Sequence, residues 1–204
     1  MRKTLTLILG IIILQLSFSC KSQYSTTELK SNFTTEQISD LNKITEFFKN
    51  QMCLGMESDF KTCYERTPHE YLEATGNGFW KNINFEKQQE LYGEISKSTF
   101  DEIWSFCKAR YPESGLELKS ICAFSIGKYQ KFLADLGKGN PRIAKYAERI
   151  HASGDFSGFD INYWEVLNNK KDFDLNNPNI QLILAIHYLS LNDQQTRKEK
   201  WESE

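Results

Sequence analysis

The stretch that decides the fold runs from Asn177 to Leu189 and reads Asn-Pro-Asn-Ile-Gln-Leu-Ile-Leu-Ala-Ile-His-Tyr-Leu. An Asn side chain accepts hydrogen bonds from the free amide groups of a first helical turn. Pro suits the first helical position because the N–H that it lacks would have no partner there. The Asn-Pro pair therefore predicts a helix start, and a largely apolar segment follows it.

Helix starts of similar chemistry recur along the chain. Two of these starts fit the capping box, in which the side chains of the cap residue and of the residue three positions later each accept a hydrogen bond from the other's backbone N–H. The other two place Pro after a short polar residue. These four starts are Thr34 with Gln37, Thr67-Pro68, Thr99 with Glu102, and Asn140-Pro141. Helix stops are predicted at Gly137 and Gly154, because Gly readily adopts the left-handed conformation that ends a helix.

Apolar residues follow these starts at the spacing of a helix with one buried face. The first segment has Ile38, Leu41, Ile44 and Phe48, and the longest has Leu118, Ile121, Cys122, Ser125, Tyr129, Phe132 and Leu136. No alternating run rich in Val, Ile and Thr competes with this pattern, and Val166 is the single Val. The sequence therefore predicts an all-α fold of about seven or eight helices.

Length and composition are those of one globular domain. The chain has 204 residues, of which 40% are hydrophobic and 13% aromatic, far from disordered compositions. Without residues 1–19 it keeps 23 basic against 27 acidic side chains. This acidic balance excludes a basic field of the kind that attracts nucleic acid.

The first nineteen residues have the three parts of a secretory signal. Arg2 and Lys3 precede an apolar run over 5–14, and a small-residue stretch follows over 16–20. A membrane-spanning helix needs about 20 apolar residues, whereas Gln15 interrupts this run. We therefore predict that residues 1–19 are a cleaved export signal.

The same stretch, Leu16-Ser17-Phe18-Ser19-Cys20, resembles the lipobox of bacterial lipoproteins, although Leu16 lies one position earlier than usual. The resemblance covers residues 1–20 and implies a diacylglycerol on the thiol of Cys20. Lys21 stands where Asp would favour the inner membrane, so the resemblance implies an outer-membrane lipoprotein that faces the periplasm or the outside.

A second interpretation of the cleavage site stays open. Ser17 and Ser19 are small residues at the spacing that ordinary signal peptidase requires, so the same bond could be cut without lipid. The number of cysteines favours lipidation of Cys20. An even number of cysteines follows it, and these could all pair in an oxidising compartment.

Four cysteines remain in the mature chain, namely Cys53, Cys63, Cys107 and Cys122. They permit three pairings, and the sequence does not select among them. We favour Cys53 with Cys63 and Cys107 with Cys122, because neighbours in sequence meet most easily, and we expect an antiparallel helix pair to carry the second bridge. The expected fold is thus one domain with one or two disulfides.

The mature chain divides into three parts. Residues 20–33 are polar after Cys20 and lack sustained periodicity, so we expect a lipid-anchored tether. Residues 34–192 form the helical domain, and residues 193–204 form a charged tail that continues the last helix or frays.

No complete catalytic or metal motif is present, so no cofactor and no metal is expected. His69, His151 and His187 are expected to be structural, with His69 able to face solvent in a first helical turn. Residues 172–176 begin like a calcium loop, but position twelve is Ile183 instead of a bidentate Glu. An enzyme is therefore the less favoured class.

Two aromatic clusters next to glycines are candidates for a contact surface. The alternative is that they fill helix junctions of the core. Their residues are Phe79, Trp80, Phe156, Phe159, Tyr163 and Trp164.

The leading hypothesis is a lipid-anchored binding protein of the cell envelope that holds a protein partner. An envelope hydrolase acting on cell wall is the first alternative, with Glu113 as the acid and His151 as a helper. A purely structural lipoprotein is the second.

Overall fold

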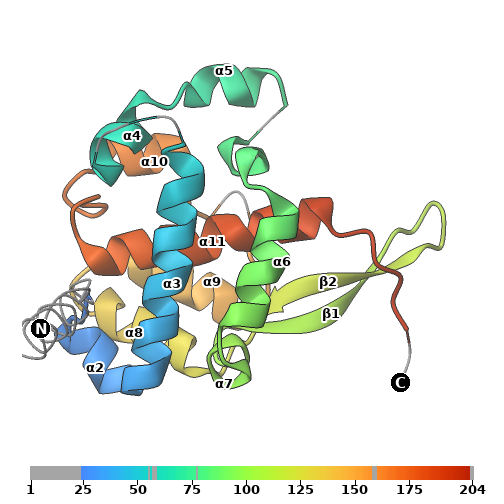
Figure 1. Cartoon of the computed structure of the whole chain (residues 1–204), viewed down its shortest axis with the longest axis horizontal. Coiled ribbons are helices and arrows are strands. Elements are labelled where there is room, and N and C mark those ends of the chain that lie inside the picture. The colour runs from blue at the N-terminus through green and yellow to red at the C-terminus, as the bar shows by residue number, and fades with distance from the viewer. Residues whose placement is uncertain (1–23, 55, 57–58, 77, 158–159, 203–204) are drawn as a thin grey trace, which may run out of the picture.

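The computed structural model describes residues 24–54, 56, 59–76, 78–157 and 160–202. Helices dominate, and one antiparallel hairpin extends from them (Figure 1). The elements in chain order are α2 (Thr27–Asn32), α3 (Thr35–Met52), α4 (Phe60–Arg66), α5 (His69–Ala74), the 3-10 helix η1 (Phe79–Asn82), α6 (Phe85–Glu94), α7 (Lys97–Phe100), β1 (Trp104–Arg110), β2 (Glu117–Ala123), α8 (Lys128–Gly137), α9 (Pro141–Ser153), α10 (Tyr163–Asn168) and α11 (Pro178–Thr196).

The hairpin shows that the all-α prediction is wrong. Residues 104–110 and 117–123, expected within helices, form β1 and β2, whose register pairs Trp104 with Ala123 and Arg110 with Glu117. The predicted seven or eight helices are also too few, because the described residues contain ten α-helices. Leu118 and Ile121 are both buried although they lie on opposite faces of β2. Because buried residues three positions apart match the spacing of a helix face, the apolar pattern predicted the wrong element.

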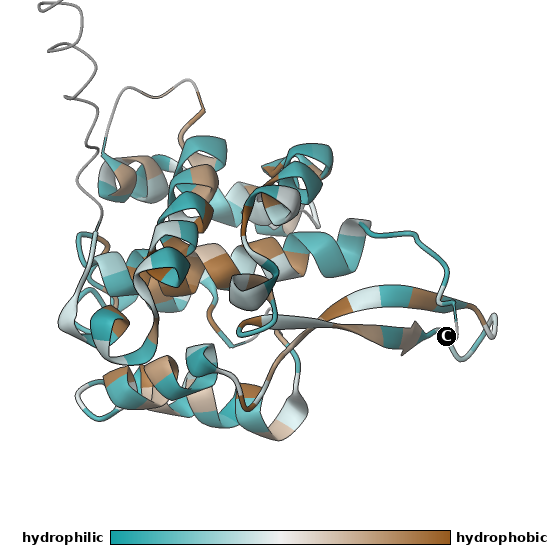
Figure 2. Ribbon diagram, turned by 60° about the horizontal axis from the view of Figure 1, so that its bottom comes forward, coloured by the Kyte–Doolittle hydropathy of each residue, from teal (hydrophilic) through white to brown (hydrophobic). Residues whose placement is uncertain are grey.

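The helix α11 is the centre of the core. It begins at Pro178, with Asn177 accepting a hydrogen bond from the Asn179 N–H, as the opening stretch predicts. Every residue from Asn179 to Asp193 is buried, so this helix is enclosed on all sides. Figure 2 shows its hydrophobic segments within a shell of helices whose outer faces are hydrophilic.

The other helices pack on α11 or on one another. The helix α3 packs on α11, while α8 packs on both α9 and α2. The predicted capping box of Thr34 and Gln37 is confirmed at the start of α3, and Gly154 ends α9 with φ 67°. None of the helices in the described part of the chain combines the length and apolar character that crossing a membrane requires.

The start of the folded region lies earlier than the sequence indicates. Residues 27–32 fall within the expected tether but form α2, with Thr26 as its cap. Leu29 and Phe33 are buried, and Phe33 packs against Phe132 of α8 with ring centroids 6.0 Å apart. These two apolar side chains were too few to give a periodic signal, yet they attach α2 to the core.

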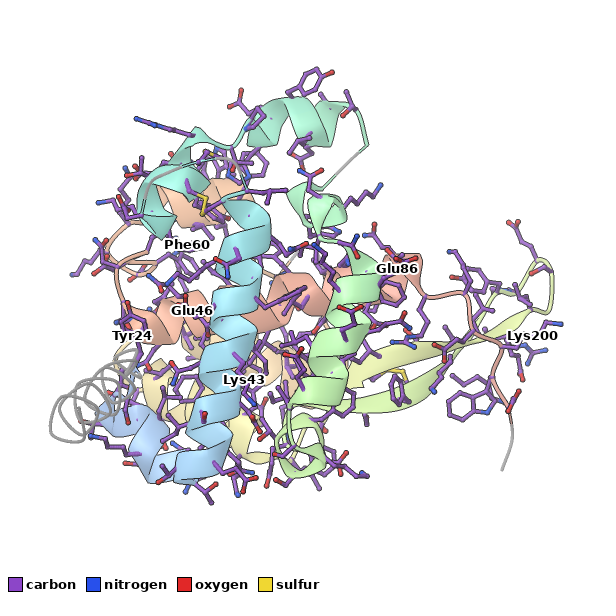
Figure 3. All side chains as sticks on the ribbon, in the orientation of Figure 1. Tyr24, Lys43, Glu46, Phe60, Glu86 and Lys200 are labelled. Carbon is purple, nitrogen blue, oxygen red and sulfur yellow. A yellow bond between two sulfur atoms is a disulfide. The ribbon has the colours of Figure 1, made fainter. Side chains whose placement is uncertain are left out.

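Both favoured disulfide pairings are confirmed. Cys53 bonds Cys63 between α3 and α4, and Cys107 bonds Cys122 within the hairpin (Figure 3). The second bridge joins two strands instead of the expected pair of helices. It links the middle of β1 to the second-last residue of β2 and so joins the two strands covalently.

The C-terminal residues pair with the outer edge of β2 through an isolated β-bridge. Lys200 pairs with Leu118 as an antiparallel bridge, the Lys119 N–H donates to the Glu199 carbonyl at 2.8 Å, and the Trp201 N–H donates to the Glu117 carbonyl at 3.1 Å. Tyr24 and Lys200 lie at opposite ends of the longest axis of the molecule (Figure 3). The hairpin is therefore remote from the first described residue.

Candidate binding groove

A hollow of about 900 Å³ lies where the end of α6, the short α7 and the start of β1 meet. Its volume is that of a ligand site, and most of its lining is aromatic or aliphatic. The apolar lining residues are Tyr92, Ile95, Phe100, Trp104, Phe106 and Phe124, and the polar ones are Lys97, Ser98, Asp101, Glu102 and Ser105. We call this hollow the hairpin groove.

Aromatic packing makes the floor of the hairpin groove rigid. The rings of Tyr92, Phe100 and Trp104 contact one another, with all three centroid separations at 5.4 Å. Trp104 is buried, and its indole N–H donates to Ser190 Oγ of α11 at 2.8 Å. This hydrogen bond holds the floor of the groove against the central helix α11 in one orientation.

A buried carboxylate holds α7 in place beside the floor. Asp40 of α3 accepts hydrogen bonds from the Ser96 N–H and the Thr99 hydroxyl, both at 2.9 Å, and pairs with Lys43. Burial raises the pKa of the Asp40 carboxyl, but these hydrogen bonds outweigh burial and hold the pKa below its usual value. Asp40 therefore stays charged and fixes one wall of the hairpin groove.

The two carboxylates of the hairpin groove are engaged in ion pairs. Glu102 accepts from the backbone N–H of Lys128 at 2.8 Å and pairs with the Lys128 ammonium at 3.2 Å. Asp101 pairs with Lys97, one helical turn earlier. Both acidic side chains of the groove therefore already have a cationic partner within the chain.

The outer wall of the hairpin groove is exposed. Phe106 of β1 is 40% exposed and Phe124 is 38% exposed. The Lys119 ammonium lies 4.1 Å from the centroid of the Phe106 ring, and the Arg197 guanidinium lies 5.0 Å from it. These cation–π contacts orient the ring while leaving part of it accessible.

The structure separates the residues of the predicted aromatic contact surface. Phe156 is 2% exposed and lies in the core. Trp80 stacks on Tyr188 of α11 with ring centroids 5.7 Å apart. Both placements agree with the alternative that these aromatics fill helix junctions.

The remaining members of that prediction differ in exposure. Tyr163 stacks on His69 with ring centroids 5.0 Å apart, whereas its neighbour Trp164 is 60% exposed. Phe159 and Cys20 lie outside the described residues, and Phe79 is described only through its backbone in η1. Neither Tyr163 nor Trp164 lines the hairpin groove.

The histidines are distributed over unrelated places. His187 is buried, and loss of solvation lowers its pKa to about 3. His69 is buried rather than facing solvent, with Nε2 2.8 Å from the Tyr64 carbonyl oxygen and a pKa lowered by burial. His151 is exposed on α9, with Nδ1 3.0 Å from the Ser125 carbonyl oxygen.

Glu113, the acid of the alternative hydrolase hypothesis, lies in the exposed turn between β1 and β2. That turn is the tip of the hairpin, which projects away from the helices (Figure 1). Glu113 does not line the hairpin groove. The structure therefore gives this carboxyl no enclosed environment in which to act as an acid.

Sequence reasoning missed the hairpin groove, although a signal for β1 was present. Residues 104–110 read Trp-Ser-Phe-Cys-Lys-Ala-Arg, in which large side chains alternate with small ones. Such alternation indicates a strand with two unlike faces. Helix-cap chemistry at Thr99 obscured it, because Ser96 is the actual cap of the short α7.

Within the described residues, no group of three or more His, Cys, Asp and Glu side chains is arranged to hold a metal ion. The sequence matches no protein-family model, no curated protein and no solved structure.

Proposed function

We propose that this chain is an exported, lipid-anchored protein of the outer membrane that binds a protein partner through the hairpin groove. The observation that carries the proposal is an exposed aromatic wall, Phe106 and Phe124, above a floor already fixed by packing. Aromatic side chains held in place before binding lose little entropy when a partner covers them, which is why they dominate binding energies.

The cysteines support the proposed address. Cys53, Cys63, Cys107 and Cys122 are all used in two disulfides, so Cys20 is the one cysteine of the sequence left for lipid. Disulfides of this kind persist in oxidising compartments such as the periplasm. Two or three acyl chains would then give stable residence on the membrane.

A capture experiment tests the binding proposal. The folded chain from residue 24 onward, immobilised through its N-terminus, is incubated with envelope extract, and retained proteins are identified by mass spectrometry. We expect the double variant Phe106→Ser with Phe124→Ser to lose the retained partner. The control is Tyr111→Ser with Leu116→Ser, which removes two similarly exposed apolar side chains near the hairpin tip.

Equal retention by the wild type and the groove variant would contradict the binding proposal. Equal loss in both variants would also contradict it, because the effect would then follow hairpin hydrophobicity in general. The anchor is tested separately by labelling cells with a radioactive fatty acid. We expect label on the wild type and none on Cys20→Ser, and an unlabelled wild type would refute the anchor.

A further inference from the structure

The alternation of hydrogen bonds shows which backbone groups of β1 face away from β2. The Phe124 N–H donates to the Ile103 carbonyl at 2.9 Å, and the Tyr111 N–H donates to the Leu116 carbonyl at 2.9 Å. In an antiparallel pair, hydrogen-bonded residues alternate with residues whose N–H and C=O point outward. The outward groups of β1 therefore belong to Trp104, Phe106, Lys108 and Arg110.

The corresponding outer edge of β2 is occupied. The Ala123 N–H donates to the Gly154 carbonyl at 3.0 Å, and the Gln194 side chain donates to the Ile121 carbonyl at 3.0 Å. Residues 199–201 supply the partners of Lys119 and Glu117. Each of the four outward-facing residues of β2 thus has a backbone group that is already hydrogen-bonded. These residues are Glu117, Lys119, Ile121 and Ala123.

The outer edge of β1 differs sharply from that of β2. Among the residues that the structure describes, the outward backbone groups of Phe106, Lys108 and Arg110 have no hydrogen-bond partner. Such an edge is a template on which an extended segment can continue the sheet. Within the described part of the chain, the hairpin therefore has one covered edge and one open edge.

The open edge is continuous with the hairpin groove. Trp104 and Phe106 line the groove, and the Phe106 ring packs against the ring of Phe100, another lining residue, with centroids 5.5 Å apart. Side chains directly opposite each other in neighbouring strands lie on the same face of a sheet. A strand added to β1 would therefore place alternate side chains over Phe106 and into the groove.

The far half of the open edge carries uncompensated positive charge. Lys108 pairs with Glu117 at 3.0 Å, whereas Arg110 has no ion pair with any described residue. Lys108 and Arg110 lie on the same face of the hairpin, so Arg110 adds a cation that no described carboxylate pairs with. Cations on an edge also oppose pairing with uncharged strands, so they select for a partner with carboxylates.

We propose that the partner docks by strand addition, as an extended peptide segment paired with β1 from residue 104 to 110. Its apolar side chains contact Phe106 and the groove, and its carboxylates face Lys108 and Arg110. This inference rests on the proposed binding function and specifies its mode. A second copy of the chain is a poor occupant, because it would bring two further cations to the same seam.

The test uses a random library of displayed ten-residue peptides, selected on the folded chain from residue 24 onward with its disulfides intact. We expect the selected peptides to alternate apolar residues with other residues and to carry Asp or Glu toward one end. Selected peptides lacking carboxylates, or a selection without enrichment, would overturn the proposal.

A matched pair of variants isolates the backbone contribution. Lys108→Pro removes one outward N–H and leaves the hydrogen bonds to β2 intact, while Lys108→Ala removes the same charge but keeps that N–H. We expect the selected peptide to bind Lys108→Pro about tenfold more weakly than Lys108→Ala. Circular dichroism checks that both variants keep the hairpin.

A modified peptide gives the same answer without changing the protein. Methylation of the peptide amides that would face β1 removes the donors and keeps every side chain, so we expect binding to fall about tenfold or more. Methylation of the alternate amides, which face away from β1, is the control. Equal affinity for both methylated peptides would overturn strand addition.

The outcomes separate this inference from the binding proposal. If capture from envelope extract depends on Phe106 and Phe124 but Lys108→Pro and amide methylation have no effect, the groove binds by another mode. If capture does not depend on the groove, the binding proposal itself fails. Concentration-dependent dimerisation that Lys108→Pro abolishes would show that a second copy is the occupant, which contradicts the partner proposed here.

Discussion

The Asp193 carboxylate receives two hydrogen bonds from the Arg197 guanidinium, one helical turn further along, at 2.8 and 2.6 Å. Both side chains are buried, and the guanidinium also covers the Phe106 ring. The pair therefore connects the end of the central helix to the outer wall of the hairpin groove.

Removing one member of this pair should destabilise the fold strongly. We expect Arg197→Met to lower the free energy of unfolding by about 3 to 5 kcal/mol, because it leaves the Asp193 charge buried and unpaired. Urea unfolding measures the change. The control is Lys170→Met, which breaks the exposed pair with Glu65 and should cost less than about 1 kcal/mol. Similar costs for both variants would contradict the assigned role of Arg197.

The two disulfides should have similar effects on stability and different effects on binding. Replacing Cys107 and Cys122 by Ser should cost about 3 kcal/mol on the loop-entropy model and weaken partner capture, because the open strand loses its covalent support. Replacing Cys53 and Cys63 by Ser should cost a similar amount and leave capture unchanged, because that bridge joins α3 and α4. Urea unfolding and capture are measured on both variants, and a greater binding loss for the second would refute this expectation.

Truncation of the C-terminal segment that pairs with β2 should make the chain self-associate. Deleting residues 198–204 removes two backbone hydrogen bonds to β2, worth about 2 kcal/mol together, and exposes a second strand edge. Size-exclusion chromatography over a range of concentrations measures the association. Deleting residues 203–204 alone is the control and should leave a monomer profile unchanged. A monomeric long truncation would show that the edge is protected by other means.

Acid should destabilise the fold through His187. Its pKa is about 3 in the folded state against 6.5 when unperturbed, so between these pH values the unfolded chain binds a proton that the folded chain excludes. Stability therefore falls as pH falls below about 6.5, by about 2 kcal/mol down to pH 5 from this group alone.

The variant His187→Gln tests the sign and the source of this pH dependence. We expect its free energy of unfolding to change less between pH 7 and pH 5 than that of the wild type, whatever its absolute stability. Urea unfolding at several pH values in this window provides the measurement. Parallel curves for the two proteins would show that His187 does not titrate as expected.

Cap chemistry predicted much of the helical framework because it is local. The Thr34 and Gln37 box and the Asn140 and Asn177 starts each depend on a few adjacent residues, and the structure confirms them. The preferred disulfide pairings are also confirmed, because residues close in sequence meet at a small loss of chain entropy.

The hairpin and its groove were not predictable in the same way, because long-range contacts decide them. The alternation of large and small side chains over 104–110 was a local signal for β1, but β2 is stabilised by α11 and residues 199–201, which are distant in sequence. The groove combines α6, α7 and β1 with Phe124, and no local motif reports that assembly.

The separation between Tyr24 and the hairpin determines how an anchored chain would meet its surroundings. On the proposed lipid anchor, the bilayer attaches at the end of the molecule opposite to the open strand of β1. The length of the domain then acts as a spacer that lifts the docking edge away from the lipid headgroups. A partner could approach from across the envelope without first reaching the membrane on which this chain stands.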